Sequence, residues 1–205
     1  MTEPPKTRRA EYAEATQSAI VAAARELYAR QGYFATTVEE IAKQARVAPA
    51  TVYAVGGGKQ GLLRTLADLW SQAPIVAETM ERQSRMTDPE EILRNTAGVV
   101  RSMRQDYGDI MRVVLATAPH NPAANEALRL GTHRYRDAVA TVAAQLSEAG
   151  GLHPDMTVQQ ATDILWFFFG YAGFTTLVED NGWTFERSEH WLAQQALIAL
   201  QAPAA

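Results

Sequence analysis

The stretch from Gly32 to Leu63, GYFATTVEEIAKQARVAPATVYAVGGGKQGLL, constrains the fold of this chain more than any other. It predicts two short helices joined by a tight turn, followed directly by the start of a third. The second of these helices is too small to hold a hydrophobic core, so its partner must fix it to the surface. A short helix held in this way is suited to entering a DNA groove.

The helix before this stretch is predicted to begin near Thr7 and to end near Gln31, where Gly32 stops it. Its apolar residues recur at helical spacing and form one stripe that we expect to be buried: Ile20, Ala23, Ala24, Leu27 and Tyr28.

The next two helices are bounded by strong local signals. Thr37 and Glu40 form a capping box, in which each side chain satisfies a backbone N–H of the other residue. This helix is expected to end at Ala45–Arg46. Pro49 suits the first position of the following helix, because its missing N–H is not needed there. That helix is predicted to run to about Val55, where a run of three glycines stops it.

The amino-acid composition further narrows the class of protein to which this chain can belong. The 205 residues include no cysteine, which excludes disulfides and thiolate metal sites and is compatible with the cytoplasm. There is no continuous run of about 18 apolar residues, so no membrane span is expected. Residues 1–64 carry a net charge of +3 and the rest −7, which fits a basic nucleic-acid-binding head. Lys6, Arg8 and Arg9 suggest an arm that contacts DNA, although a solvated terminus explains them equally well.

The rest of the chain also shows helical patterns with short connections, so the predicted fold is all-α with about nine helices. We expect an N-terminal helix-turn-helix DNA-binding domain at 1–58 and a helical ligand-binding and dimerisation domain at 59–205. Predicted helices of the second domain run from Lys59 to the Pro74 region, Asp88–Pro89 to Tyr107–Gly108, Asp109 to Thr117, Asn121–Pro122 to Leu146, Thr157 to Val178, and Thr184 to Gln201.

The pattern GY-x-x-TTV-x-x-IA-x-x-A-x-V-x-x-x-TVY, followed by GK-x-x-LL, resembles the DNA-binding domain of TetR-family transcriptional regulators. The resemblance implies a helical regulatory domain, a homodimer, a double-stranded DNA operator and a small-molecule effector. It also implies DNA contacts for Thr36, Thr37, Pro49, Ala50, Thr51, Tyr53 and Lys59. Among these, Thr37 is also a plain helix cap, and a core position is the alternative for Tyr53. A phosphate contact by Arg46 is a separate hypothesis, because this residue departs from the family pattern.

Three residues depart from the pattern of this family. Arg46 stands where the turn usually has glycine, Ala48 stands where a capping serine or threonine is common, and Gly56 stands where phenylalanine is usual. A non-glycine residue at positive φ and a lost cap each cost about 1 kcal/mol. The recognition helix also lacks Arg, Asn and Gln for bidentate base contacts, so Thr51 or DNA shape must contribute more to base recognition.

The resemblance places an effector pocket inside the second domain. Candidates by position are Trp70, Met103, Tyr107, Met111, Leu115, His133, Trp166, Phe169 and Phe174, and each has a plain core role as its alternative. Residues 164–174, ILWFFFGYAGF, are apolar almost all round and must be buried on more than one side. With the last helix, they would form a four-helix dimer interface, or else an intramolecular core.

The leading hypothesis is therefore a repressor that binds a palindromic operator as a dimer and is released by a hydrophobic small molecule. The alternatives are a small-molecule-binding dimer with a weakened DNA head, and an enzyme. No metal site, cofactor or enzymatic activity is expected, because the four histidines lack metal-ligand spacing and no dinucleotide motif occurs. The segment GGGKQG is not a phosphate-binding loop, because Gln60 replaces the required Ser or Thr.

Overall fold

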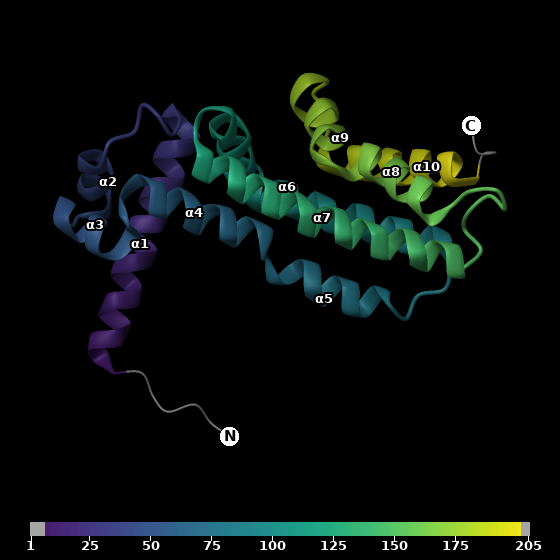
Figure 1. The fold of residues 1–205 in the computed structure, drawn as a ribbon, viewed down its shortest axis with the longest axis horizontal. Coiled ribbons are helices and arrows are strands. Elements are labelled where there is room, and N and C mark those ends of the chain that lie inside the picture. Colours follow the sequence, from purple (N-terminus) through teal and green to yellow (C-terminus); the bar gives the residue numbers. More distant parts are fainter. Residues whose placement is uncertain (1–6, 202–205) are drawn as a thin grey trace. The chain divides into compact units, whose positions relative to one another are not determined.

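The computed structural model describes residues 7–201, apart from the side chain of Arg9, and this part of the chain is helical with no strand (Figure 1). Lys6 and the side chain of Arg9, two parts of the suggested arm, lie outside the described residues. The helices are α1 (Arg8–Gln31), α2 (Val38–Ala45), α3 (Pro49–Gly56), α4 (Gly58–Ser71), α5 (Pro74–Gln83), α6 (Pro89–Thr117), η1 (Ala118–His120), α7 (Pro122–Glu148), α8 (Val158–Phe169), α9 (Tyr171–Thr175), the π-helical η2 (Thr176–Asp180) and α10 (Phe185–Gln201). The predicted all-α class is confirmed.

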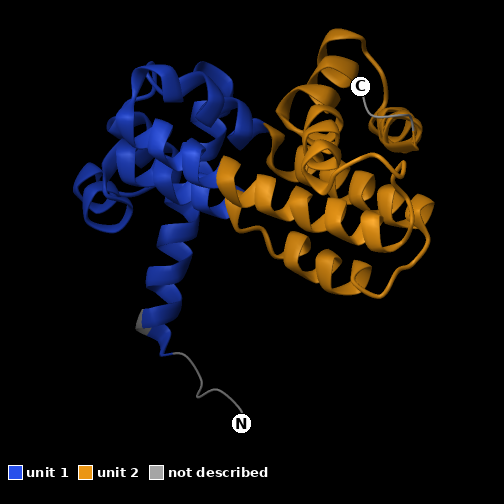
Figure 2. Cartoon of the chain, turned by 45° about the vertical axis from the view of Figure 1, so that its right-hand side comes forward, with its two compact units in different colours: residues 1–70, 109–131 blue, residues 71–108, 132–205 orange. Residues whose placement is uncertain are grey.

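The chain divides into two compact units (Figure 2). Unit 1 comprises residues 1–70 and 109–131, and unit 2 comprises residues 71–108 and 132–205. Helices α6 and α7, and α4 by its last residue, therefore have residues in both units. The proposed functional boundary between residues 58 and 59 stays a prediction.

In unit 1, α1 contacts both α2 and α3, and α2 contacts α3. The predicted stripe of α1 is buried, and so are Ile41 of α2 and Val52 of α3, which are both 0% exposed. The ring of Tyr28 is also buried, and its hydroxyl donates to the carbonyl of Lys59 at 3.0 Å. Fully burying a large apolar side chain contributes about 1.5–3 kcal/mol to the stability of the fold. The short α2 and α3 are thus held by the side of α1 and not by their own propensity.

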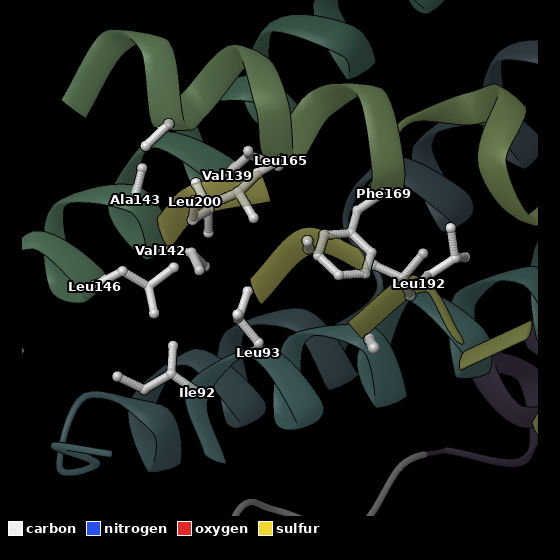
Figure 3. Packing of buried hydrophobic residues seen from close by; sticks show 14 of the residues in the cluster. Ile92, Leu93, Val139, Val142, Ala143, Leu146, Leu165, Phe169, Leu192 and Leu200 are labelled. Carbon is white, nitrogen blue, oxygen red and sulfur yellow. The ribbon is translucent and has the colours of Figure 1, made fainter. Parts of the chain in front are cut away.

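The core of unit 2 is built mainly from α6, α7, α8 and α10, with one side chain each from α9 and η2 (Figure 3). Ile92 and Leu93 of α6 lie with Leu146 of α7, while Leu165 and Phe169 come from α8. These five side chains are at most 1% exposed. The start of α6 follows from the sequence, because Asp88 caps it by accepting the N–H of Glu90 at 3.1 Å.

The predicted helix end at Tyr107–Gly108 is wrong. Helix α6 continues from Pro89 to Thr117 without interruption. A glycine inside a helix costs only about 1 kcal/mol relative to alanine. Buried residues on both sides of Gly108, Met103 and Ile110 among them, outweigh that cost by packing the helix into the structure before and after the glycine.

The predicted helix from Thr157 to about Val178 is instead broken at Gly170. A Cβ at this position would lie 2.3 Å from the carbonyl oxygen of Trp166, so only glycine fits. By its length and its apolar composition alone, the segment Val158–Asp180 could cross a membrane. In this fold it is bent at Gly170, and it places Leu165 and Phe169 in the core of unit 2.

Candidate functional site

The turn between α2 and α3 sets the orientation of α3. Arg46 adopts the left-handed conformation, with φ 58° and ψ 41°, and it is the only non-glycine residue with positive φ in the described part of the chain. Its N–H donates to the carbonyl of Lys43 at 3.3 Å, and the N–H of Val47 donates to the carbonyl of Ala42 at 2.9 Å. These two bonds form a Schellman motif, which closes α2 and requires a left-handed residue at position 46. Arg46 therefore occupies the backbone conformation in which a non-glycine residue is strained.

Helix α3 presents its outer face to solvent. Val52 is its buried anchor, whereas Pro49 and Ala50 are exposed at its first turn and Thr51 is half-buried. The ring of Tyr53 is 60% exposed, so it is not a core residue. Ala48 provides no side-chain cap, as its sequence position predicted. The exposed face is therefore small and largely apolar, with one tyrosine hydroxyl.

At the N-terminus of α2, the side chain of Glu40, a residue of the same helix, accepts hydrogen bonds from Thr37. The Glu40 carboxylate accepts the N–H of Thr37 at 2.8 Å and the Thr37 hydroxyl at 3.0 Å, which confirms the capping box. These hydrogen bonds lower the pKa of Glu40. Thr36 is 1% exposed, and its hydroxyl donates to the carbonyl of Gly32 at 2.8 Å. A phosphate contact by Thr36 would therefore have to come from its backbone.

Lys59 lies in the first turn of α4 and is half-buried. Its ammonium is 3.4 Å from the carbonyl oxygen of Phe34 and 4.7 Å from the ring centre of Tyr33. Burial lowers the pKa of this lysine, while the charge of Glu40 opposes the shift. The ammonium group is thus held by two weak contacts, near the Glu40 carboxylate of the capping box. A DNA phosphate could replace these contacts or add to them.

Glycines join α3 to α4. Gly57 and Gly58 have φ of 65° and 67°, which a side chain would disfavour. A Cβ on Gly58 would lie 3.1 Å from the ring of Tyr53. This close approach places the tyrosine ring over the start of α4, one residue before Lys59.

The effector candidates fall in both units. Trp70 and Met111 are buried in unit 1, where Leu115 is half-buried. In unit 2, the side chains of Met103, Phe169 and Phe174 are buried, and those of Tyr107 and Trp166 are half-buried. The His133 side chain is 71% exposed and lies 2.8 Å from the carboxylate of Asp137, one turn further along α7.

Unit 1 also contains a shallow hollow between α4, α6 and the start of α7. Its lining includes none of the predicted effector residues and consists of Gln60, Leu63, Arg64, Ala67, Val114, Ala123, Ala124 and Ala127. No group of three or more histidine or acidic side chains in the described residues could hold a metal ion.

Sequence reasoning missed one polar cluster in unit 2. Arg104 is only 7% exposed, although it is an arginine, and it lies among the rings of Tyr135 and Tyr171. The missed signal is its position, because residue 104 falls on the same helical stripe as the apolar residues Val100 and Met103. A charge in the middle of an apolar stripe is rarely fully buried without a partner.

Comparisons with known proteins agree with this geometry. Residues 20–66 match the family model described as "Bacterial regulatory proteins, tetR family". This match covers α2, α3 and parts of α1 and α4. No curated protein sequence matches the chain.

Among solved structures, the fatty acid degradation regulator FadR from Bacillus halodurans is 18% identical, with a TM-score of 0.74 over 91% of this chain and 96% of its own. SmeT in complex with triclosan is 19% identical, with a TM-score of 0.74 over 93% of each chain. FadR from Bacillus subtilis in complex with stearoyl-CoA is 18% identical, with a TM-score of 0.67 over 92% of this chain and 99% of its own. At these identities the likeness shows the fold.

Proposed function

We propose that this chain, which resembles TetR-family transcriptional regulators in the sequence of its head and in its fold, is a ligand-responsive repressor. The observation that carries the proposal is the helix-turn-helix of unit 1. It presents Pro49, Ala50 and the hydroxyl of Tyr53 on an exposed, short α3 that is anchored by Val52. A surface helix of this kind fits the major groove of a double-stranded operator.

In this proposal, α3 reads bases and the surrounding residues hold the DNA backbone. Lys59 and Arg46 supply positive charge, and Thr36, Thr37 and Tyr53 contribute backbone or hydroxyl groups to phosphates. Ala50, Thr51 and Pro49 reach base edges, mostly through apolar contact with thymine methyl groups. With so few polar groups on α3, DNA shape contributes to the choice of operator.

A homodimer would give this small reading head enough contacts. Helices α8 and α10 pack against each other and leave large apolar side chains exposed: Phe167 is 75%, Ile198 62% and Trp191 38% exposed. An exposed apolar surface on two adjacent helices suits a second copy of the same surface. The four helices would then form the dimer interface, and two heads would bind a palindromic operator.

The effector is proposed to be a hydrophobic small molecule bound in the helical body. Structures of SmeT with triclosan and of FadR with stearoyl-CoA support this, because their fold is the same. The ligand must prefer the state that does not bind DNA, and a coupling of about 1–3 kcal/mol is typical for such regulation. We propose that the protein acts in the cytoplasm, where DNA is accessible, and that it is not an enzyme.

Gel retardation of the DNA upstream of the protein's own gene tests the proposal. We expect retardation by the wild-type protein at low salt without ligand. Lys59→Ala should weaken binding to specific and non-specific DNA alike and lower the salt slope by about 1, because one phosphate contact is lost. Arg94→Ala is the matched control, since Arg94 is exposed in unit 2 and paired with Glu90.

Absence of any retardation at low salt would contradict the repressor proposal. It would favour the alternative, a small-molecule-binding dimer whose DNA head is weakened by Arg46, Ala48 and Gly56. Loss of operator preference by Lys59→Ala, with unchanged binding to non-specific DNA, would contradict the phosphate role of this lysine.

A further inference from the structure

Arg104 of α6 is a buried charge at the bend between α8 and α9. Its side chain lies in unit 2 with a residue exposure of 7%. One terminal nitrogen, Nη2, donates to the carbonyl of Gly170 at 2.9 Å. The Nε atom is buried and has no hydrogen-bond partner. A guanidinium has five N–H donors, so this environment leaves much of its donor capacity unused.

Arg101, one turn earlier on α6, provides a direct comparison. Its Nε is likewise buried without an aligned hydrogen bond, but it lies 2.7 Å from the carboxylate of Glu189. A second carboxylate, that of Glu186, is 3.1 Å from its Nη1. The charge of Arg101 is therefore neutralised within unit 2. In the described part of the chain, no carboxylate forms an ion pair with Arg104.

The neighbours of Arg104 are aromatic and neutral. Its guanidinium carbon is 6.0 Å from the ring centre of Tyr135 and 5.9 Å from that of Tyr171. Burial raises the pKa of both tyrosines, although the charge of Arg104 opposes the shift, so neither is a phenolate that could balance it. Both hydroxyls are engaged, that of Tyr135 with the carbonyl of Phe169 and that of Tyr171 with Thr132 at 2.8 Å.

The acidic group on the adjacent face of α8 is also in use. Asp163 lies 2.6 Å from the guanidinium of Arg136, which covers the ring of Trp166 at 5.2 Å. An arginine that is buried without a counter-ion is costly, because a desolvated charge is stabilised only by pairing and hydrogen bonding. The contacts with Gly170 and the tyrosine rings offset part of that cost and leave the positive charge unbalanced.

We propose that Arg104 and the rings of Tyr135, Trp166 and Tyr171 form the anion-recognition site of the effector, and that the effector is an aromatic carboxylic acid. This inference rests on the proposed function, because it assigns the ligand class of that effector. The carboxylate would accept the unpaired Nε–H of Arg104 together with a second guanidinium N–H, the fork geometry that arginine offers to carboxylates.

The aromatic part of the ligand follows from the same cluster. Trp166 lies 5.2 Å from Tyr135 and 5.5 Å from Tyr171 in edge-to-face arrangements, and the two tyrosine rings are 6.1 Å apart. These three side chains are half-buried, so the cluster extends from the buried guanidinium to the surface of unit 2. A planar ring would pack against the exposed side of this cluster in the edge-to-face or offset geometry that aromatic rings prefer.

Binding of a matched pair of probes to the purified full-length protein tests this inference. Biphenyl-4-carboxylate and biphenyl-4-carboxamide have the same shape, but only the first is charged at neutral pH. Isothermal titration calorimetry should show that the wild-type protein binds the carboxylate at least about 10-fold more tightly, because a hydrogen bond to a charged partner discriminates by roughly this factor or more. The carboxylate should also raise the thermal unfolding midpoint more than the carboxamide.

Arg104→Met should lower the affinity for the carboxylate by about 10- to 100-fold and leave that for the carboxamide within about 3-fold, since only the charged contact is removed. Arg101→Met is the matched control and should preserve the preference for the carboxylate. If Arg104→Met does not fold, the comparison of the two probes on the wild-type protein still tests the inference, because equal affinities would overturn it.

The inference is overturned if the wild-type protein binds neither probe, if it binds both equally, or if Arg104→Met retains the preference. These outcomes are distinct from failure of the proposed function, since the calorimetry contains no DNA. A protein that retards its upstream DNA but ignores both probes refutes only the anion site. A protein that prefers the carboxylate but binds no DNA refutes only the repressor.

Discussion

Replacing Arg46 with glycine should stabilise unit 1. A left-handed conformation costs an L-residue about 1–2 kcal/mol, and Arg46 holds φ 58° and ψ 41°. Glycine removes this cost. However, glycine also gives the unfolded chain more conformational freedom, which lowers the stability of the fold by about 0.4–1 kcal/mol. At the middle of these two ranges, the net gain is about 0.5–1 kcal/mol. For a chain of this size, that corresponds to an increase of about 1–4 °C in the unfolding midpoint.

The backbone at this position cannot relax to avoid the cost. The bond from the N–H of Val47 to the carbonyl of Ala42, at 2.9 Å, closes α2 only when residue 46 is left-handed. Arg46→Ala is therefore the matched variant: it removes the same side chain and keeps the strain. We expect it to be about 0.5–1 kcal/mol less stable than Arg46→Gly.

Guanidinium chloride unfolding and calorimetry of the two variants measure this difference. Both variants also lose the same positive charge, so any phosphate contact by Arg46 should weaken DNA binding equally in the two proteins. Equal stability of Arg46→Gly and Arg46→Ala would refute the argument from backbone strain. A larger loss of DNA affinity in one variant would show instead that the turn conformation, and not the charge, controls the position of α3.

Two further predictions concern stability. The Asp109 carboxylate accepts hydrogen bonds from Arg25 at 2.7 and 2.8 Å. Burial raises the pKa of this carboxyl, but the hydrogen bonds from Arg25 and from backbone N–H groups, together with the charge of Arg25, outweigh burial and hold the pKa below its usual value. The pair therefore stabilises the fold at pH above the unfolded pKa of about 3.9 and loses its contribution as pH falls through the lower folded pKa, so Asp109→Asn should flatten the acid limb of a stability–pH profile. Phe169 is 0% exposed, and Phe169→Ala should cost about 3–5 kcal/mol in denaturant unfolding, whereas truncation of the exposed Phe167 should cost far less in the monomer.

Most helix boundaries could be predicted from the sequence, because caps act over three or four residues. Thr37 with Glu40 and Thr157 with Gln160 form the capping boxes that open α2 and α8. The sequence also singled out Arg46, because it stands where this turn usually has glycine, and the structure shows that its φ is positive. The helix-turn-helix of unit 1 was predicted from the spacing of such residues, which is a local property of the chain.

Other features depended on contacts between distant segments. Gly108 looks like a helix end and lies inside α6, because packing on both sides exceeds the small cost of a helical glycine. Gly170 looks like a residue for close helix packing, yet it marks a break, since the carbonyl of Trp166 leaves no room for a Cβ. Neither outcome can be read from a window of neighbouring residues.

The sequence by itself determined the all-helical class, the helix-turn-helix and its unusual turn, because periodicity, caps and turn residues act locally. Only the tertiary structure decided that Arg104 is buried without a counter-ion, whereas Arg101, three residues before it, is paired with two carboxylates. Burial and pairing depend on which residues from α7, α8 and α10 meet α6, and those contacts are separated by tens of residues along the chain.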